Sequence, residues 1–174
     1  IQNGWSPCTQ MPNVPVTIHF DDKDWTPSNS SSKKLDGKML TIRKALANSV
    51  NYVTAYIMKQ FGPQAVITVA RRMGITANID PYPSICLGTP DISVFEMVGA
   101  YCSFANKGTW IEPTFITRIE DKNGKVLYEY VPKKVEVMDE EKAYIMLQLL
   151  KGVTQYGTGS GLRGAPFGFT EAIA

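Results

Sequence analysis

The fold of this chain is determined largely by residues 40–61, LTIRKALANSVNYVTAYIMKQF, in which apolar and small side chains recur at helical spacing. Intervals of three and four residues bring such side chains onto one face of an α-helix. Two stripes follow one another, the first made of Ile42, Ala45, Leu46 and Ser49 and the second of Val50, Val53, Thr54, Ile57 and Phe61. Gly62-Pro63 comes next and ends the helix, with Pro63 in the first turn of another. A helical cluster is therefore predicted from Leu40 onward.

Three more helices are predicted downstream. The first begins at Pro63. The second begins after Thr89, which precedes a proline and is preferred as the N-cap, although Ser93 has capping-box spacing to the glutamate three residues further on. The third covers residues 139–151, with acidic side chains at its positive end. The expected core faces are, in chain order, Val66, Val69, Ala70 and Met73; Phe95, Val98, Gly99, Cys102 and Ala105; and Ala143, Met146, Leu147 and Leu150.

A β-hairpin is predicted just before the last of these helices. Asn123-Gly124 separates two β-rich runs, residues 114–120 and 125–131, and this dipeptide is the strongest short hairpin signal. Residues 14–20 also allow one short strand. Helices followed by a hairpin and a further helix favour an α+β fold, a helical cluster with an antiparallel sheet.

Composition limits the classes of function. The 174 residues carry 18 Lys and Arg against 16 Asp and Glu, and a net charge of +2 without a basic stripe argues against a nucleic-acid partner. No apolar run approaches the ~20 residues of a membrane span. Three cysteines without a Cys-x-x-Cys pair, and a single histidine, predict neither a metal site nor Ser-His-Asp chemistry. We expect no disulfide among Cys8, Cys86 and Cys102, with Cys102 an inert thiol buried on its helix.

Ser49-Val50-Asn51 is the candidate catalytic motif. Its hydroxyl and carboxamide both donate and accept hydrogen bonds without carrying charge, which suits proton relay and substrate binding. The alternative is that Ser49 and Asn51 only mark helix ends, since both residue types favour caps. Residues two apart lie about 200° apart around a regular helix. If both side chains serve one pocket, the helix must therefore break between Asn48 and Asn51.

Other candidate motifs carry less weight. Ser30-Ser-Ser-Lys33 and Ser31-Ser-Lys-Lys34 have the Ser-x-x-Lys spacing of a serine nucleophile and its lysine base, but they lie in a polar run that is typical of a loop. Gly157-Thr158-Gly159 is interpreted as a tight turn rather than a phosphate-binding loop, because no strand precedes it and no lysine follows. His19, in a proline-rich segment, is expected at the surface.

A longer ordered series of residues surrounds the candidate motif. It consists of Pro27-x-Asn29, Gly37, Leu40-Thr-Ile-Arg43-x-Ala45-Leu46-Ala47-x-Ser49-x-Asn51, Pro83-Ser84-x-x-Leu87-Gly88, Glu96-Met-x-x-Ala100-Tyr101-x-x-Phe104-Ala105-Asn106-x-Gly108, Asp121-x-x-Gly124-x-Val126-Leu127 and Gly157-Thr158-Gly159. This series covers nearly the whole chain and is far more specific than Ser-x-Asn alone. It resembles the middle of the transpeptidase domain of a class A penicillin-binding protein.

The resemblance implies a partial β-lactamase/transpeptidase-like fold and cross-linking of peptidoglycan by an acyl-serine mechanism, with no cofactor and no metal. It implies that Ser49 relays a proton between a lysine base and the leaving D-alanine amine, and that Asn51 binds the substrate's amide carbonyl and helps orient the lysine. The implied partners are peptidoglycan stem peptides and, as substrate mimics, β-lactam antibiotics. The implied location is extracytoplasmic, in a membrane-anchored parent protein that also carries a glycosyltransferase, with no anchor in this chain.

The same resemblance implies that residues 1–174 are only part of that domain. Of the superfamily's motifs, Ser-x-x-Lys, Ser-x-Asn and Lys-Thr-Gly, only the second stands in its expected context. The nucleophile helix is expected upstream of residues 1–5, and the Lys-Thr-Gly strand just after residues 167–174. This chain alone is therefore expected to be inactive, to expose Val50, Val53, Ile57 and Phe61 of the second stripe and to self-associate. Two alternatives stay open, a serine β-lactamase-like hydrolase and a non-catalytic penicillin-binding-like recognition module.

Overall fold

The computed structural model describes residues 4–30 and 33–170, and the predictions made for residues 1–3, 31–32 and 171–174 lie outside this described part. The α-helices are α1 (Ile42–Ala47), α2 (Asn51–Arg72), α3 (Val94–Ala105) and α4 (Glu140–Gln155). The strands are β1 (Gln10–Pro12), β2 (Ile18–Phe20), β3 (Lys23–Trp25), β4 (Met39–Thr41), β5 (Thr109–Ile111), β6 (Arg118–Glu120), β7 (Val126–Glu129) and β8 (Lys134–Glu136). Short 3₁₀ helices are η1 (Lys33–Leu35), η2 (Pro83–Leu87) and η3 (Ser160–Arg163).

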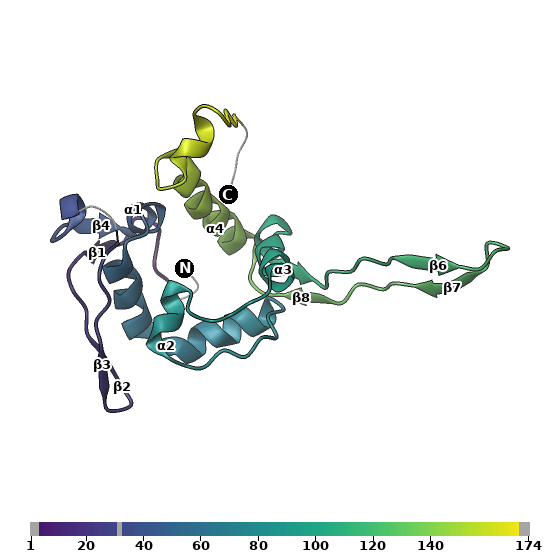
Figure 1. Cartoon of the computed structure of the whole chain (residues 1–174), viewed down its shortest axis with the longest axis horizontal. Helices are drawn as coiled ribbons and strands as arrows, with labels where there is room; N and C mark the ends of the chain where they lie inside the picture. Colours follow the sequence, from purple (N-terminus) through teal and green to yellow (C-terminus); the bar gives the residue numbers. More distant parts are fainter. Residues whose placement is uncertain (1–3, 31–32, 171–174) are drawn as a thin grey trace.

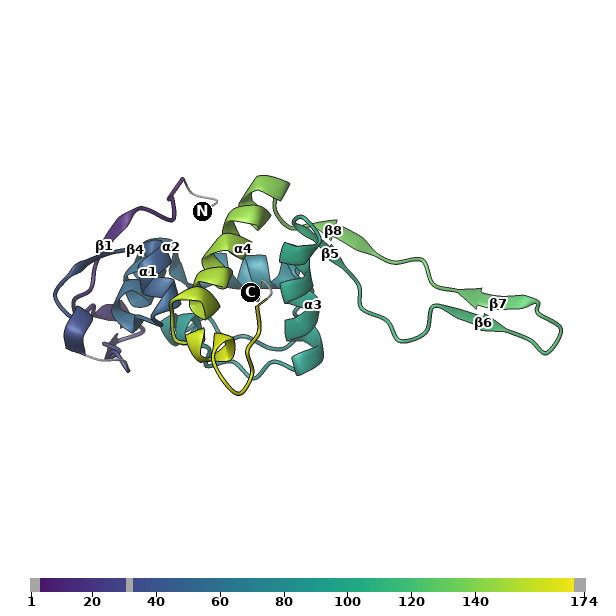
Figure 2. The ribbon, with the colours of Figure 1, turned by 90° about the horizontal axis from the view of Figure 1, so that it is seen from above.

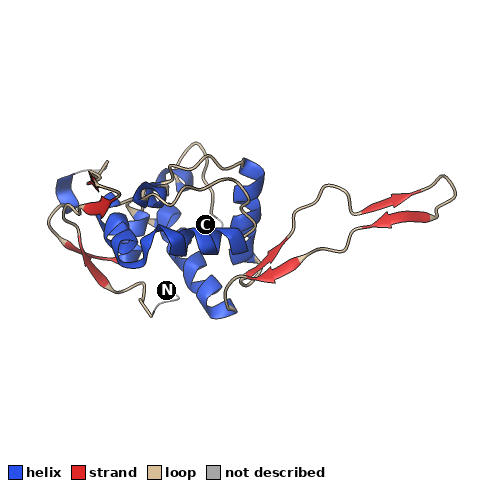
Figure 3. Ribbon diagram, turned by 90° about the horizontal axis from the view of Figure 1, so that it is seen from below, coloured by secondary structure: helices blue, strands red, loops and turns tan. Residues whose placement is uncertain are grey.

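The strands of the described residues pair two by two, and every pair is antiparallel. Figure 3 shows the strands of the projecting arm as red arrows that run in opposite directions. β1 pairs with β4, β2 with β3, β5 with β8 and β6 with β7. The predicted α+β class is confirmed. Within the described residues the antiparallel pairing is divided among separate two-stranded ladders, whose strands are three or four residues long.

The helical cluster is organised around α2. α4 lies against α1 and α3, and η2 lies against α2 (Figure 1 and Figure 2). Buried side chains form three small clusters, one around Val53 near the start of α2, one around Met58 in its first half and one around Met73 at its end. The first cluster includes Val50, which lies between α1 and α2. Apolar packing therefore fixes the place where these two helices meet.

The predicted break at Gly62-Pro63 is confirmed. Gly62 has φ 73° and ψ 163°, so α2 consists of two helical halves joined at a kink. Pro63 stands in the first turn of the second half, where a missing N–H leaves no helical hydrogen bond unmade. As a result the first half packs beneath α1 and β4, and the second half packs against α3.

The expected exposure of the second stripe is wrong for Val50 and Val53, whereas Ile57 and Phe61 are half-buried. Val50 and Val53 are 1% and 2% exposed. Met11 and Leu40, which face each other in the β1–β4 ladder, cover them. The part of the chain that precedes α1 thus closes this face, and sequence periodicity on α2 alone does not reveal that cover.

α3 begins one turn later than predicted, with Ser93 rather than Thr89 as its N-cap. The Ser93 hydroxyl accepts a hydrogen bond from the Glu96 N–H (3.2 Å), and the Glu96 carboxylate accepts one from the Ser93 N–H, which completes a capping box. The same carboxylate accepts hydrogen bonds from the hydroxyl and N–H of Thr76 and from the N–H of Ala77. The Thr76 hydroxyl, followed by the other donors, lowers the pKa of Glu96 to about 2. Reciprocal capping therefore prevails over the preference of proline for a first helical turn.

The buried face of α3 also differs from the prediction. Gly99, Ala100 and Ser103 are buried. The other predicted core positions are exposed: Phe95, Val98, Cys102 and Ala105. Small residues form the contact face because the chain after β5 approaches closely, and a Cβ on Gly99 would lie 2.9 Å from Pro113 Cγ. Val98, Cys102 and Ala105 instead line an apolar groove of about 310 Å³ against Leu147 and Leu150 on α4, and Phe95 packs against the ring of Phe115.

The predicted hairpin is confirmed and forms an arm that projects from the helical body (Figure 1 and Figure 2). The Asp121 carboxylate accepts hydrogen bonds from the N–H groups of Asn123 (2.8 Å) and Lys125 (2.9 Å). Gly124 has φ 81°, a left-handed conformation that glycine adopts without steric cost. Apolar side chains along the arm are exposed, Phe115 at 88%. Hydrogen bonds of the turn and of the β6–β7 ladder, rather than burial, therefore hold this element together.

Candidate active site

A tight break in the helical backbone separates Ser49 from Asn51. α1 ends two residues before Ser49 and α2 begins at Asn51, which confirms the predicted break. The Ser49 N–H donates to the Leu46 carbonyl (3.1 Å) and the Val50 N–H donates to the Ala45 carbonyl (3.0 Å). These are the two hydrogen bonds of a Schellman C-cap, which turns the chain sharply at the end of α1.

Ser49 occupies the strained position of this turn. Its φ is 53°, in the left-handed region where such caps usually carry glycine, and a residue with a Cβ there costs about 1–2 kcal/mol. The side chain is exposed, and its hydroxyl makes no hydrogen bond within the described part of the chain. Unfavourable backbone conformations of this kind concentrate at functional sites. The Ser49 side chain caps neither helix, since the N-cap of α2 is Val50 and the C-cap of α1 is Asn48.

The Asn51 side chain is half-buried and is fixed by one hydrogen bond. Its Nδ2 donates a hydrogen bond to the Ser28 carbonyl at 2.7 Å. A carboxamide nitrogen carries two hydrogens, so one N–H of Asn51 and its Oδ1 are left without a partner among the described residues. Asn51 can therefore donate to one group and accept from another while Ser28 fixes its rotamer.

Behind the junction lies a polar network that sequence reasoning missed. Asn29 Oδ1 accepts a hydrogen bond from the Tyr52 N–H (3.2 Å), and Asn29 Nδ2 donates to Asn13 Oδ1 and to Asp36 Oδ1, both at 2.9 Å. Asn13 is 0% exposed and donates from Nδ2 to the Leu35 carbonyl (2.8 Å). The ordered series of the sequence includes Asn29 but gives no role to it. A contact between side chains 16 residues apart leaves no local signal that could have identified it.

Gly157-Thr158-Gly159 packs against the end of α1. The Ser160 N–H donates to the Gly157 carbonyl (3.1 Å), which confirms the predicted tight turn. The Thr158 N–H donates to the Ala47 carbonyl at 2.9 Å, and a Cβ on Gly157 would lie 2.0 Å from the same oxygen. The absence of a side chain on Gly157 therefore lets the chain after α4 lie directly on the residue two positions before Ser49.

The two Ser-x-x-Lys matches do not open an α-helix. Lys33–Leu35 forms a single 3₁₀ turn, and Ser30 and Lys34 are exposed. Ser31 lies outside the described residues. A single 3₁₀ turn lacks the packed helical geometry that places a lysine base beside a serine nucleophile.

None of the cysteines has the features of a reactive thiol site. All three are free, with Cys8 exposed and Cys86 half-buried. The expectation that Cys102 is buried is wrong, because its face of α3 lines the groove described above. Burial raises the pKa of Cys86 to about 11, which keeps it protonated near neutral pH.

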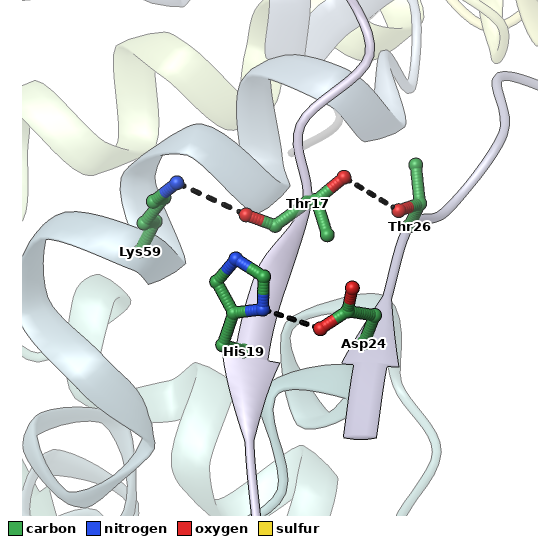
Figure 4. A network of polar contacts seen from close by, with 5 residues as sticks. All are labelled: Thr17, His19, Asp24, Thr26 and Lys59. Carbon is green, nitrogen blue, oxygen red and sulfur yellow. Dashed lines mark hydrogen bonds and ion pairs between the residues drawn. The ribbon is translucent and has the colours of Figure 1, made fainter. Parts of the chain in front are cut away.

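His19 belongs to a polar cluster on the β2–β3 ladder (Figure 4). Its Nδ1 contacts the Asp24 carboxylate directly across the ladder. The hydroxyls of Thr17 and Thr26 share a hydrogen bond of 2.8 Å, and Lys59 Nζ donates to the Thr17 carbonyl at 3.0 Å. The His19 side chain is 77% exposed, which confirms its predicted surface position. The hydrogen bond from Lys59 therefore connects the β2–β3 ladder to α2.

The described residues contain no cluster of His, Cys, Asp and Glu side chains suited to hold a metal ion. Over the same ranges, no helix combines the length and the hydrophobicity that crossing a bilayer requires. The functional groups at the α1–α2 junction are a neutral hydroxyl and a neutral carboxamide.

Comparison with known proteins identifies the family. The family described as "Penicillin binding protein transpeptidase domain" matches residues 1–170. The chain belongs to this penicillin-binding transpeptidase family. Penicillin-binding protein 2D of Bacillus subtilis (strain 168) is 36% identical over 155 residues, a match that covers 88% of this chain and 22% of that protein. The chain thus spans about a fifth of the length of this penicillin-binding protein.

Solved structures of penicillin-binding proteins share the fold. Penicillin-binding protein 1A of Haemophilus influenzae has a TM-score of 0.78 at 20% identity, over 92% of this chain and 29% of that one. Penicillin-binding protein A of Mycobacterium tuberculosis, solved as an imipenem acyl-enzyme complex, has a TM-score of 0.72 at 14% identity, over 88% of this chain and 40% of that one. The predicted transpeptidase-like fold is therefore confirmed.

Proposed function

We propose that this chain forms part of the active site of a serine D-Ala-D-Ala transpeptidase that cross-links peptidoglycan. The observation that supports this most is the strained turn that presents Ser49 beside Asn51, in a chain of the penicillin-binding transpeptidase family. In this proposal the nucleophilic serine, its lysine base and the Lys-Thr-Gly strand belong to parts of the protein outside residues 1–174.

Ser49 is proposed to relay a proton during acylation. The nucleophilic serine loses its proton to the lysine as its oxygen bonds to the carbonyl carbon of the penultimate D-alanine. The carbon–nitrogen bond to the terminal D-alanine then breaks, and the leaving nitrogen takes a proton. Ser49 donates its proton to that nitrogen and accepts one from the lysine. Because its hydroxyl has no hydrogen bond within the described part of the chain, this exchange breaks no internal contact.

Asn51 is proposed to bind the stem peptide and to orient the lysine. The N–H that Ser28 does not use donates to an amide carbonyl of the peptide, and Oδ1 accepts a hydrogen bond from the lysine amine. The fixed rotamer of Asn51 places both atoms before the substrate arrives, which lowers the entropic cost of positioning.

The proposal extends to inhibitors and to location. β-Lactam antibiotics are proposed to acylate the same nucleophilic serine as mimics of the peptide, and the imipenem acyl-enzyme of a protein with this fold supports this. The site is proposed to act outside the cytoplasmic membrane, where its peptidoglycan substrate lies. We place it in a membrane-anchored parent that also carries a glycosyltransferase.

The test uses the complete protein that carries this segment and a fluorescent penicillin. Ser49→Ala and Ser49→Gly are expected to slow acylation roughly 10²–10⁴-fold, the usual contribution of a positioned proton-transfer group. Ser49→Gly also controls for folding, because glycine relieves the left-handed strain and should unfold at an equal or higher urea concentration. A Ser49→Gly protein that is acylated at the wild-type rate would exclude Ser49 from the reaction.

The 174-residue chain by itself is expected to form no covalent adduct with the same penicillin. Ser49 has no lysine partner among the described residues, and an ordinary serine hydroxyl is a poor nucleophile. Intact-protein mass spectrometry checks this directly. A stoichiometric adduct on any serine of the chain would contradict the placement of the nucleophile outside it.

A further inference from the structure

We propose that Asn29 is a positioning residue for acylation: it holds the first turn of α2, and through it Asn51, in the orientation that the reaction needs. This inference rests on the proposed transpeptidase function. Asn29 does not touch the substrate in this proposal and acts only through Asn51 and its backbone.

The first turn of α2 has no cap of its own. The first backbone N–H groups of a helix have no partner within the helix. Val50, the N-cap residue, has an apolar side chain and makes no side-chain capping hydrogen bond. Asn29 Oδ1 accepts from the Tyr52 N–H instead, at 3.2 Å. Asn29 therefore caps α2 from 23 residues away.

Ser28 and Asn29 each accept a hydrogen bond from the first turn of α2. The Ser28 carbonyl accepts a hydrogen bond from Asn51 Nδ2 at 2.7 Å, and Asn29 Oδ1 accepts from the backbone of the next residue, Tyr52. Because Ser28 and Asn29 are joined by one peptide bond, a shift of Asn29 also moves the carbonyl that fixes the Asn51 rotamer. The orientation of Asn51 thus depends on the position of Asn29.

Asn29 is itself held by two further side chains. Its Nδ2 donates to Asn13 Oδ1 and to Asp36 Oδ1, both at 2.9 Å. Asn13 is fully buried, and its own Nδ2 is used by the Leu35 carbonyl. A buried amide with its oxygen and nitrogen both engaged is a rigid anchor, since moving it would leave a polar group unpaired in the interior. The network thus connects a rigid anchor to the candidate catalytic asparagine.

The consequence for catalysis follows from geometry. Acylation requires the free N–H and Oδ1 of Asn51 to meet substrate and lysine at hydrogen-bond distance, and a misplacement of about 1 Å can cost on the order of 100-fold in rate. Without the Asn29 side chain, Asn51 is still present, but the contacts that fix its orientation are weakened. We therefore expect a loss of rate that the loss of stability does not account for.

The experiment measures acylation of the complete protein by a fluorescent penicillin in three variants and a control. Asn29→Ala removes every contact of the side chain. Asn29→Asp keeps an acceptor for the Tyr52 N–H but sets an oxygen against both Asp36 and Asn13 Oδ1, of which the double variant relieves only the contact with Asp36. Asn29→Asp combined with Asp36→Asn restores a donor–acceptor pair between these two positions. Val137→Ala is the control for destabilisation, because Val137 is 1% exposed and belongs to the core cluster at the other end of α2.

Asn29→Ala is expected to slow acylation roughly ten- to a hundredfold, whereas Val137→Ala keeps the wild-type rate despite a lower unfolding midpoint. Asn29→Asp is expected to be slow, and the added Asp36→Asn is expected to recover several-fold of its rate. Hydrogen exchange at the start of α2 should be faster in Asn29→Ala and unchanged in Val137→Ala.

Two results overturn the inference alone: an Asn29→Ala protein that is acylated as fast as Val137→Ala, or a double variant no faster than Asn29→Asp. A wild-type protein that no penicillin acylates overturns the proposed function and this inference with it. The two failures are therefore distinguishable in one set of measurements.

Discussion

Gly157→Ala tests whether the chain after α4 holds the end of α1 in place. A Cβ at residue 157 would lie 2.0 Å from the Ala47 oxygen, 2.7 Å from the Ala47 carbonyl carbon and 2.9 Å from the Val153 oxygen. Ordinary contacts at such a Cβ are 3.4–4 Å. Because the obstructing atoms are backbone, no side chain can rotate away, and the two segments must separate.

The expected change in the free energy of unfolding of Gly157→Ala is the sum of two destabilising contributions and one stabilising contribution. Overpacking costs about 1–3 kcal/mol, and the Thr158 N–H to Ala47 hydrogen bond of 2.9 Å contributes about 0.5–1.5 kcal/mol that is lost when the segments part. Alanine returns about 0.4–1 kcal/mol by restricting the unfolded chain. The free energy of unfolding should therefore fall by about 0.5–4 kcal/mol. For a chain of this size a loss near the middle of that range lowers the melting temperature by roughly 5–10 °C.

Gly161→Ala is the matched control, in the same glycine-rich segment. Among the described residues, apart from Gly161 itself and its two chain neighbours, no heavy atom lies within 4 Å of a Cβ at residue 161, and its φ lies outside the left-handed region. Its unfolding free energy should stay within about 0.5 kcal/mol of the wild type or rise slightly. The assay is urea unfolding of wild type and both variants, followed by circular dichroism. Equal midpoints for Gly157→Ala and Gly161→Ala would refute the close approach.

Three further outcomes are expected. Glu96→Gln should lower the free energy of unfolding near neutral pH, and its difference from wild type in urea unfolding should disappear as pH falls from about 4.5 towards 2. The pKa of the Glu96 carboxyl is depressed, so its stabilisation is present above the ordinary pKa and is lost on protonation. A difference in unfolding free energy that does not change with pH would contradict this. Cys86 should react with a disulfide reagent at pH ~8 far more slowly than Cys8, because a pKa of about 11 leaves only about one thiol in a thousand ionised. All three cysteines should react in urea, which serves as the control. Equal labelling rates of Cys86 and Cys8 in the folded chain would contradict the prediction. Self-association of the 174-residue chain stays a prediction, now based on the apolar groove between α3 and α4 and the exposed hairpin arm, and a monomer at every concentration in sedimentation would be evidence against it.

The features that could be predicted from the sequence are those governed by neighbours in the chain. Helical spacing over residues 40–61 predicts α1 and α2, and Gly62-Pro63 predicts the kink because glycine permits the backbone conformation found there. Asn123-Gly124 predicts the hairpin turn. The break before Asn51 follows from the geometry of a helix once two side chains are required in one site. In each case the deciding interactions act over a few residues, so the local pattern contains them.

Which faces are buried and how the site is held depend on contacts between distant residues. The apolar stripe of α3 predicted a core face, yet the structure buries its small residues, because Gly99 lets the chain at Pro113 approach to a distance that no larger residue permits. Asn29 meets Asn13 across 16 residues, and Thr158 meets Ala47 across more than a hundred. A hydrogen-bond partner or a close backbone contact is chosen by the three-dimensional path of the chain. The sequence by itself therefore determined the helix break that carries Ser49 and Asn51, and only the tertiary structure decided what holds that break in position.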